Sequence, residues 1–182
     1  ANDKFGWIAP IFSLLDISGK FLSFNDLKGD KGTVIAFICN HCPYVISIAE
    51  RLSKEAIELK KHSINTIAIM SNDVSKYPED SYENMKIFAN KYNFIFPYLF
   101  DDKQDVARNY QAVCTPDIFG FNNKNSLSYR GRLDSGVMNT KDKKIVRELY
   151  NAMIKIKNDG SGPKEQFNSF GCSIKWKENV RK

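Results

Sequence analysis

The sequence has little cysteine and no long apolar run, and both shortages narrow the class of protein. Its 182 residues include four cysteines, which are too few for a small domain held together by disulfides. No stretch approaches the about 18 apolar residues of a membrane-spanning helix, and no signal-peptide pattern opens the chain. We therefore expect a cytoplasmic protein without a membrane partner. Because the chain begins at Ala1 and not at Met, a removed leader stays open.

Positive charge is not concentrated anywhere in the sequence. The net charge of +6 is spread among acidic residues, without a basic stripe that interleaves with aromatics, so we expect no nucleic-acid partner. Hydrophobic residues make up 42% and aromatic residues 13% of the chain, which is enough for one core. We expect a single domain over 1–182, with a hairpin extension over 1–32, a core over 33–157 and an irregular tail over 158–182.

The most informative stretch is 34–45, where an apolar, β-branched run leads into Cys39-Asn40-His41-Cys42-Pro43. Pro43 suits the first helical position because its missing N–H would have no partner there, which puts Cys42 at or beside the N-cap. The unpaired N–H groups and the positive end of the helix dipole favour a thiolate. Cysteines in such places have pKa values of about 3.5 to 7.5. The sequence therefore predicts thiol chemistry at Cys42.

Strands and helices alternate along the chain, which predicts an α/β protein with a sheet covered on both faces. Continuous apolar runs predict buried strands over 33–38 and 64–70. Because ligands bind beyond the carboxyl ends of such strands, we expect Cys39, Cys42 and 71–73 at one rim. The other expected elements are a hairpin over 11–24, helices over 43–61, 81–92, 104–110 and 141–157, a strand over 96–100, and a hairpin over 118–130. For the second of these helices we expect Asp80 or Ser81 as the N-cap, with Glu83 as the capping-box partner of Asp80.

Several motifs in the same order resemble a known family. They are Asn40-His41-Cys42-Pro43-Tyr44-Val45, 71–74 with 77–81, Cys114-Thr115-Pro116-Asp117, 129–132 and 171–177. Together they look like the peroxiredoxin-like, thioredoxin-domain proteins of the alkyl hydroperoxide reductase and thiol-specific antioxidant superfamily, over nearly the whole chain. The resemblance implies a thioredoxin-like fold with a central mixed β-sheet flanked by helices. It also implies a cis Thr115–Pro116 bond opposite the active cysteine, with both residues presenting a backbone edge to the substrate.

The resemblance also suggests which cysteine attacks. In thioredoxin-like chains the nucleophile lies five residues beyond a strand phenylalanine, and Phe37 stands at that distance from Cys42. The alternative register makes Cys39 the attacking thiol and Cys42 the resolving one. With Cys42 as nucleophile, Cys39 or Cys114 is expected to resolve it, whereas Cys172 lies past a glycine-rich break whose docking the sequence does not reveal.

The expected activity is thiol–disulfide exchange. The Cys42 thiolate would attack a disulfide of a protein or small molecule, and a second thiol would resolve the mixed disulfide without a cofactor. His41 is expected to contact the substrate or to stabilise the thiolate. Among the other candidates, Arg130 and Arg132 could supply a guanidinium to a peroxide, but both are expected to be surface residues.

Three alternatives remain open. A thiol peroxidase would resemble the pattern Pro-x-x-x-Thr-x-x-Cys, but Ile35 and Cys39 stand at its proline and threonine positions. A zinc or copper(I) module would use Cys39, His41 and Cys42 or Cys114, yet a second paired-cysteine motif is missing. A non-catalytic scaffold would leave Cys42 with an ordinary pKa.

Overall fold

The computed structural model describes residues 4–139, 141 and 144–178. Its strands are β1 (Ser13–Asp16), β2 (Phe21–Ser23), β3 (Gly32–Phe37), β4 (Ile64–Met70), β5 (Tyr98–Phe100), β6 (Cys114–Thr115), β7 (Asp117–Phe121), β8 (Leu127–Gly131) and β9 (Cys172–Ser173). Its helices are α1 (Phe24–Leu27), α2 (Pro43–Lys60), the 3₁₀ helix η1 (Pro78–Asp80), α3 (Tyr82–Lys91), α4 (Asp105–Asn109) and α5 (Glu148–Asp159). In this part of the chain, no helix is long and apolar enough to cross a membrane.

Seven strands form one mixed sheet in the order β2-β1-β5-β4-β3-β7-β8. The pairs β3–β4 and β4–β5 are parallel, while β7 runs antiparallel to β3 and β8 antiparallel to β7. All six residues of β3 are buried, because helices or loops cover both faces of the sheet centre. The expected central mixed sheet and N-terminal hairpin are therefore present.

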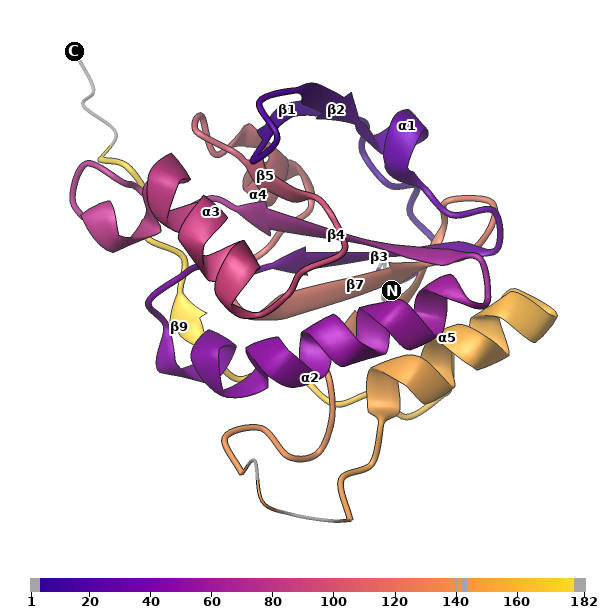
Figure 1. Cartoon of the computed structure of the whole chain (residues 1–182). Coiled ribbons are helices and arrows are strands. Elements are labelled where there is room, and N and C mark those ends of the chain that lie inside the picture. The colour runs from indigo at the N-terminus through magenta and orange to yellow at the C-terminus, as the bar shows by residue number, and fades with distance from the viewer. Residues whose placement is uncertain (1–3, 140, 142–143, 179–182) are drawn as a thin grey trace.

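The core lies in two layers, one on each face of the sheet. On one face α2, α3 and α5 bury apolar side chains such as Leu52, Met85 and Leu149, and Figure 1 shows α2 and α5 side by side there. The other face buries Phe24 and Val106 from α1 and α4 with an aromatic cluster. In α2 and α5 the buried residues recur at helical spacing, as expected from the sequence.

Local signals at the start of α2 act as the sequence predicts. Pro43 is the first helical residue and Cys42 is the N-cap, with extended backbone angles. The carboxyl end of β3 lies a few residues upstream, so strand and helix together fix the loop that carries Cys39 and Cys42. This arrangement places Cys42 at the amino end of an 18-residue helix.

One expected helix start is wrong, and one expected capping box does not form. The last helix was expected from Lys141, but α5 begins at Glu148, because the chain before it bonds to a loop instead: Val146 N–H donates to Ser135 Oγ at 2.7 Å, and Ser135 N–H donates to Val146 O at 3.0 Å. Residues 140 and 142–143 of that expected helix lie outside the described residues. In α3, Ser81 is the N-cap and its hydroxyl accepts the Asn84 N–H, so no capping box forms between Asp80 and Glu83.

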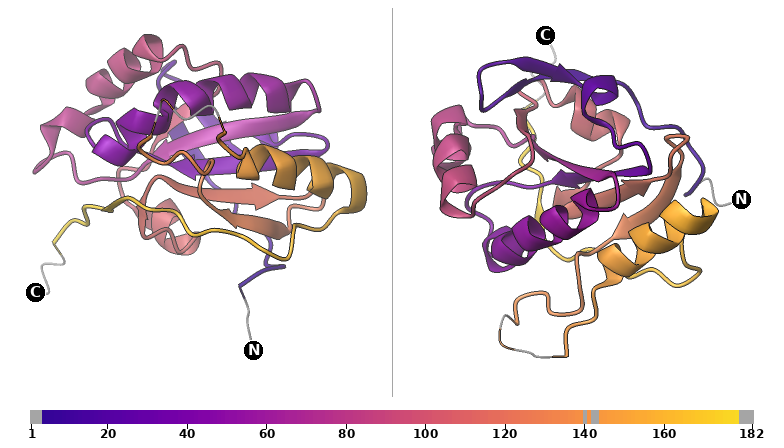
Figure 2. Two further views of the ribbon diagram at one scale, coloured as in Figure 1. Left: turned by 90° about the horizontal axis from the view of Figure 1, so that it is seen from below. Right: turned by 45° about the vertical axis from the view of Figure 1, so that its right-hand side comes forward.

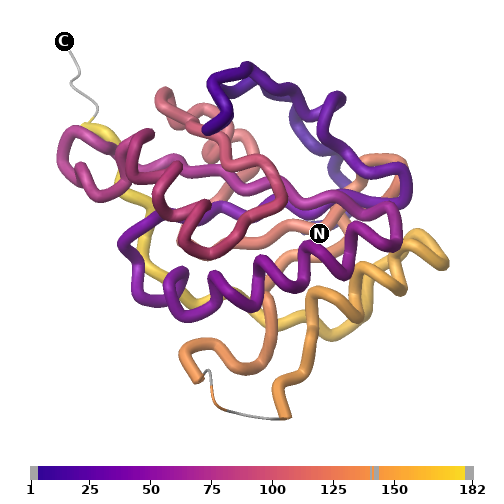
Figure 3. The backbone as a smooth tube through the Cα atoms, in the orientation of Figure 1, coloured from indigo at the N-terminus to yellow at the C-terminus, as the bar shows by residue number. Residues whose placement is uncertain are grey.

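The chain after α5 is mostly irregular, as expected, but it also contains a strand. β9 pairs antiparallel with β6, with Cys172 opposite Thr115 and Ser173 opposite Cys114. In the left view of Figure 2 this segment runs from the end of α5 across the width of the molecule. Figure 3 shows it, in yellow, passing beside the start of α2.

Candidate active site

Cys42 lies beneath the end of the chain, with a second sulfur in contact with it. Its side chain is fully buried, and its Sγ is 2.7 Å from Cys172 Sγ and 3.3 Å from the carbonyl oxygen of Thr115. The sequence placed Cys42 correctly at a helix start. It did not show that Cys172 returns to the same point, since no local pattern in the sequence encodes the docking of a distant segment.

The surroundings of Cys42 favour its thiolate. A hydrogen bond from the Cys39 thiol is the largest cause that lowers the pKa of Cys42, and the Cys172 thiol and backbone N–H groups at Val45 and Cys172 add to it. Burial acts in the opposite direction, and the resulting pKa is about 4. Cys42 is therefore a thiolate at neutral pH, stabilised mainly by donors that face its sulfur.

Cys172 and Cys39 keep their protons. Burial, followed by the neighbouring Cys42, raises the pKa of Cys172 to about 11. Cys39 is raised further, first because its proton is bonded to Cys42 and then by burial and the charge of Asp80. The Cys39 sulfur also lies 3.6 Å from Thr115 Oγ1. The site thus combines one thiolate with two thiols that can donate to it.

The Thr115–Pro116 peptide bond is cis, which confirms the expectation. Thr115 contributes its carbonyl oxygen to the surroundings of Cys42 and its hydroxyl to those of Cys39. Cys114 takes a different environment: its Sγ is 3.5 Å from the carbonyl oxygen of Pro116, and burial raises its pKa to about 12. Its expected role as a resolving thiol stays a prediction.

His41 faces the loop before α3. Its Nδ1 lies 2.7 Å from Asp80 Oδ2, and its ring stacks on Tyr77 with centroids 5.6 Å apart. The exposed part of its side chain leaves it at the rim of the site, consistent with either of its expected roles.

Asp80, which the sequence analysis assigned to helix capping, is a buried structural residue of the site. It is fully buried, and its carboxylate accepts the Asn40 N–H at 2.7 Å and the Asn72 side-chain amide at 2.9 Å. It was interpreted as a helix cap because Asp is common in that position. Its membership of the 77–81 motif was the only available signal for another role.

Three donor groups lie close enough to share a metal ion: Cys39, His41 and Asp80 have ligand atoms within 4.8 Å of one another. Their chemistry suits zinc. However, Asp80 already bonds to Asn40 and Asn72. The expected metal ligands were Cys39, His41 and either Cys42 or Cys114. The observed group contains Asp80 in place of Cys42 or Cys114.

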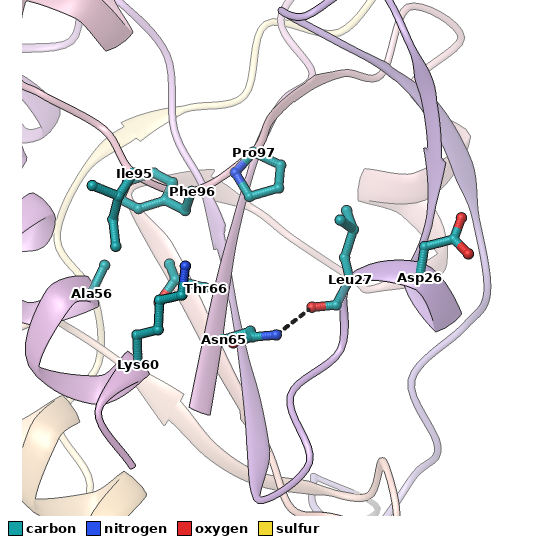
Figure 4. Close-up of a pocket in the computed structure, with 9 residues that line it drawn as sticks. All are labelled: Asp26, Leu27, Ala56, Lys60, Asn65, Thr66, Ile95, Phe96 and Pro97. Atoms are coloured by element: carbon teal, nitrogen blue, oxygen red, sulfur yellow. Dashed lines mark hydrogen bonds between the residues drawn. The ribbon is translucent and has the colours of Figure 1, made fainter. Parts of the chain in front are cut away.

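A cavity lies at the far end of the sheet from Cys42. Its lining comes from α1, the last turns of α2 and the start of β4, with Lys60 and Thr66 among the residues drawn in Figure 4. The Asn65 side-chain amide closes one side by donating to Leu27 O at 3.1 Å. Because α2 begins at the cysteine site and ends at this cavity, the two are separated by the length of that helix.

Known proteins share this architecture and part of this sequence. A model of the AhpC/TSA family matches residues 5–132. The thioredoxin-like protein YneN of Bacillus subtilis is 28% identical over 116 residues, so the match spans 63% of this chain and only 63% of that protein. A crystal structure of an uncharacterized conserved protein from Geobacillus kaustophilus is 40% identical, with a TM-score of 0.90, over 97% of this chain and 94% of that chain.

A more distant structure shares the fold alone. The thioredoxin domain of the thiol-disulfide oxidoreductase BVU-2223 from Bacteroides vulgatus is 20% identical, with a TM-score of 0.61, over 75% of this chain and 94% of that chain. This likeness confirms the expected thioredoxin-like α/β fold.

Proposed function

The chain belongs to the AhpC/TSA family, and we propose that it is a thiol–disulfide oxidoreductase whose nucleophile is Cys42. The observation that carries this proposal is the Cys42 sulfur, which combines a helix N-cap position, a pKa of about 4 and a second sulfur at 2.7 Å. A thiolate with a neighbouring thiol is what a two-electron exchange with a disulfide requires.

The reaction would proceed in two displacements. The Cys42 thiolate attacks one sulfur of a disulfide, forms a mixed disulfide and expels the other sulfur as a thiolate, which takes up a proton. A second protein thiol then loses its proton and attacks the Cys42 sulfur, so that the remaining half of the substrate leaves as a thiol. The substrate gains two electrons, and the protein dithiol becomes a disulfide.

The residues around Cys42 have separate proposed roles. Thr115 and Pro116 bring a backbone carbonyl to the reacting sulfur and would orient the substrate. His41, at the rim, would contact the substrate or the departing thiol. Cys39 holds the thiolate through its hydrogen bond, and this bond supports a role for Cys39 as donor at least as well as a role as resolving thiol.

Direct peroxide reduction is the second candidate, favoured by the family match and by the neighbouring thiol of Cys172. The guanidinium groups do not support it. Arg130 donates to Asp117 at 3.0 Å, and Arg132 makes a bidentate pair with Glu148 at 2.6 and 3.0 Å. Both are therefore engaged in structural ion pairs, so disulfide exchange remains the first candidate.

Oxidised glutathione tests the proposal, because glutathione release from the reduced protein can be followed directly. We expect Cys42→Ser to slow this release about 100-fold or more, since the substitution removes the thiol with the lowered pKa. The control adds Lys20→Cys, at an exposed turn residue, to Cys42→Ser and thus restores the thiol count with an ordinary cysteine. Release at the wild-type rate from either variant would contradict the proposal.

A further inference from the structure

The end of the chain forms a strap over the active cysteine. We define the tail as residues 160–178, which follow α5 and include β9. β9 takes the place beside β6, where it completes a two-stranded sheet with Thr115 opposite Cys172. The backbone edge that the fold offers to an extended substrate is thus already paired with a segment of the same chain.

Upstream of Cys172 the tail is tied to β8. Gln166 bonds through its side-chain amide to the backbone of Arg130 at 2.9 Å and of Ser128 at 3.0 Å. The Arg132 N–H donates to Phe167 O at 3.0 Å, and the Ser169 hydroxyl donates to Gly131 O. These bonds hold the tail along the edge strand of the main sheet before it reaches β6.

Downstream of Cys172 two buried side-chain amides act as a receptor for the tail backbone. Gln104, which is fully buried, donates to Lys175 O at 2.9 Å and accepts from Lys177 N–H at 2.9 Å. Asn72 accepts from Lys175 N–H at 2.9 Å, and its amide also bonds to Asp80. Departure of the tail would break the three bonds that these amides make with its backbone, which makes release costly.

Two further features show how closely the tail fits. Ile174 is 3% exposed and belongs to the aromatic core layer. A Cβ on Gly171 would lie 2.0 Å from the Thr115 carbonyl oxygen, so only glycine permits this approach of the two backbones. The docking therefore depends on both an apolar anchor and the absence of a side chain beside the site.

The docked tail brings the sulfurs of Cys42 and Cys172 close to disulfide-bonding distance. A disulfide bond is about 2.05 Å long, so the 2.7 Å separation of Cys42 and Cys172 closes with a shift of less than about 1 Å. Cys42 is wholly covered, whereas Cys172 is partly exposed. A small molecule can reach the sulfurs of Cys42 and Cys172 after a local shift of β9. A polypeptide that pairs with the backbone of β6 must instead displace the tail from that strand.

We propose that Cys172 is the resolving cysteine of Cys42, and that the docked tail restricts the enzyme to small disulfides by occupying the edge that an extended polypeptide would use. This inference rests on the proposed role of Cys42 as nucleophile. After Cys42 has attacked a small disulfide, the first departing thiolate takes the Cys172 proton, and the Cys172 thiolate attacks the Cys42 sulfur. The second half of the substrate leaves, and a Cys42–Cys172 disulfide remains.

The return half of the cycle uses the exposure of Cys172. A small reducing thiolate attacks the Cys172 sulfur of the disulfide, and Cys42 leaves as its stabilised thiolate. A second reducing thiolate then attacks the outer sulfur of the mixed disulfide on Cys172. Cys172 takes up a proton, the reductant becomes a disulfide, and the dithiol form is restored.

The first experiment maps the disulfide formed by the full-length protein with one equivalent of oxidised glutathione. We expect a Cys42–Cys172 bridge in most molecules, and a stable mixed disulfide on Cys42 in Cys172→Ser. A bridge from Cys42 to Cys39 or Cys114 would overturn the assignment of Cys172 while leaving Cys42 as nucleophile. An unreactive Cys42 in both proteins would instead overturn the proposed function, so the two failures are distinguishable.

The second experiment measures the ratio of insulin reduction to oxidised-glutathione reduction. Gly171→Ala forces β9 away from Thr115. We expect this substitution to raise the ratio about tenfold, because a modest shift of the docking equilibrium toward the undocked tail changes its population by about that factor. Gly160→Ala is the matched control, because it adds the same methyl group to the tail where no atom lies within 4 Å. Gly160 has a positive φ, so alanine there also strains the backbone and lowers the stability of the fold. The control therefore separates an effect of tail displacement from an effect of lower stability.

Ile174→Ala provides the same comparison by a different route if Gly171→Ala fails to fold. It removes the apolar anchor without adding any atom near Cys42, and the same rise in the ratio is expected. A ratio that stays at the wild-type value in the folded variants, or that rises equally in Gly160→Ala, would overturn the restriction to small disulfides.

Discussion

Asp80 Oδ1 accepts a hydrogen bond from the backbone N–H of Asn40 at 2.7 Å, so a fully buried carboxylate holds the loop between Cys39 and Cys42. The other oxygen of Asp80 bonds to Asn72, whose own carbonyl oxygen accepts from the tail. One carboxylate therefore links the cysteine loop to the receptor of the tail.

Replacement of Asp80 should weaken both the fold and the site. We expect Asp80→Asn to lower the free energy of unfolding by about 2 kcal/mol, because one charge-assisted acceptor of backbone N–H is replaced by a neutral amide in a buried position. Urea unfolding measures this change. Glu79→Gln, an exposed neighbour in the same 3₁₀ turn, is the control and should leave the unfolding midpoint unchanged.

The reactivity of Cys42 should follow its lowered pKa. With a pKa of about 4, the rate of Cys42 carboxamidomethylation by iodoacetamide should be nearly constant from about pH 6 to 8 and fall below about pH 4. An ordinary cysteine loses its rate about tenfold per pH unit below about 8.5. Mass spectrometry of each cysteine-containing peptide provides the profile, with Cys114 as the internal comparison. A tenfold loss at Cys42 between pH 8 and 7 would contradict the thiolate assignment.

The lowered pKa of Cys42 should make the stability of the fold depend on pH. The pKa of Cys42 is lower in the folded protein than in the unfolded chain, so the thiolate stabilises the fold most fully above the unfolded pKa. This contribution is lost as the pH falls from about 8.5 toward about 4. We expect the stability difference between the reduced protein and Cys42→Ser to shrink over that range, as measured by urea unfolding. A difference that grows on acidification would be incompatible with a lowered pKa.

Oxidation should stabilise the chain if the tail disulfide forms. A bridge from Cys42 to Cys172 spans a sequence separation of 130 residues. Closing a loop of roughly this size lowers the entropy of the unfolded state by the equivalent of about 5 kcal/mol in the chain-entropy model. Urea unfolding of the oxidised and reduced protein measures the gain. Cys172→Ser should show none, and an equal gain in that variant would point to another pair.

Arg130 should be important for stability and not for peroxide chemistry. Its guanidinium pairs with Asp117, which is 3% exposed, so Arg130→Ala leaves a buried carboxylate without its cation. We expect a loss of about 3 kcal/mol in unfolding free energy, with Lys124→Ala as the exposed control. The rate of Cys42 oxidation by hydrogen peroxide in the folded variant should change less than about threefold. A much larger loss of that rate would favour the peroxidase alternative.

Much of the fold and the position of Cys42, the proposed nucleophile, could be predicted because their signals are local. The apolar run of β3 and the Pro43 that follows it place Cys42 at a helix N-cap wherever the rest of the chain lies. The hairpin of β7 and β8 is likewise encoded in neighbouring residues. By contrast, the expected start of the last helix failed, since a contact with Ser135 holds Val146 outside it.

The sequence by itself thus determined that Cys42 stands at a helix N-cap, because helix capping signals act over a single turn. Only the tertiary structure decided which sulfur meets it and what covers it. The pairing of Cys172 with Thr115 depends on Gln104, Asn72 and a glycine that lets two backbones touch. Asp80 likewise turned inward because buried N–H groups were available there. Contacts between distant segments depend on complementary shapes and unsatisfied polar groups, and these exist only once the chain has folded.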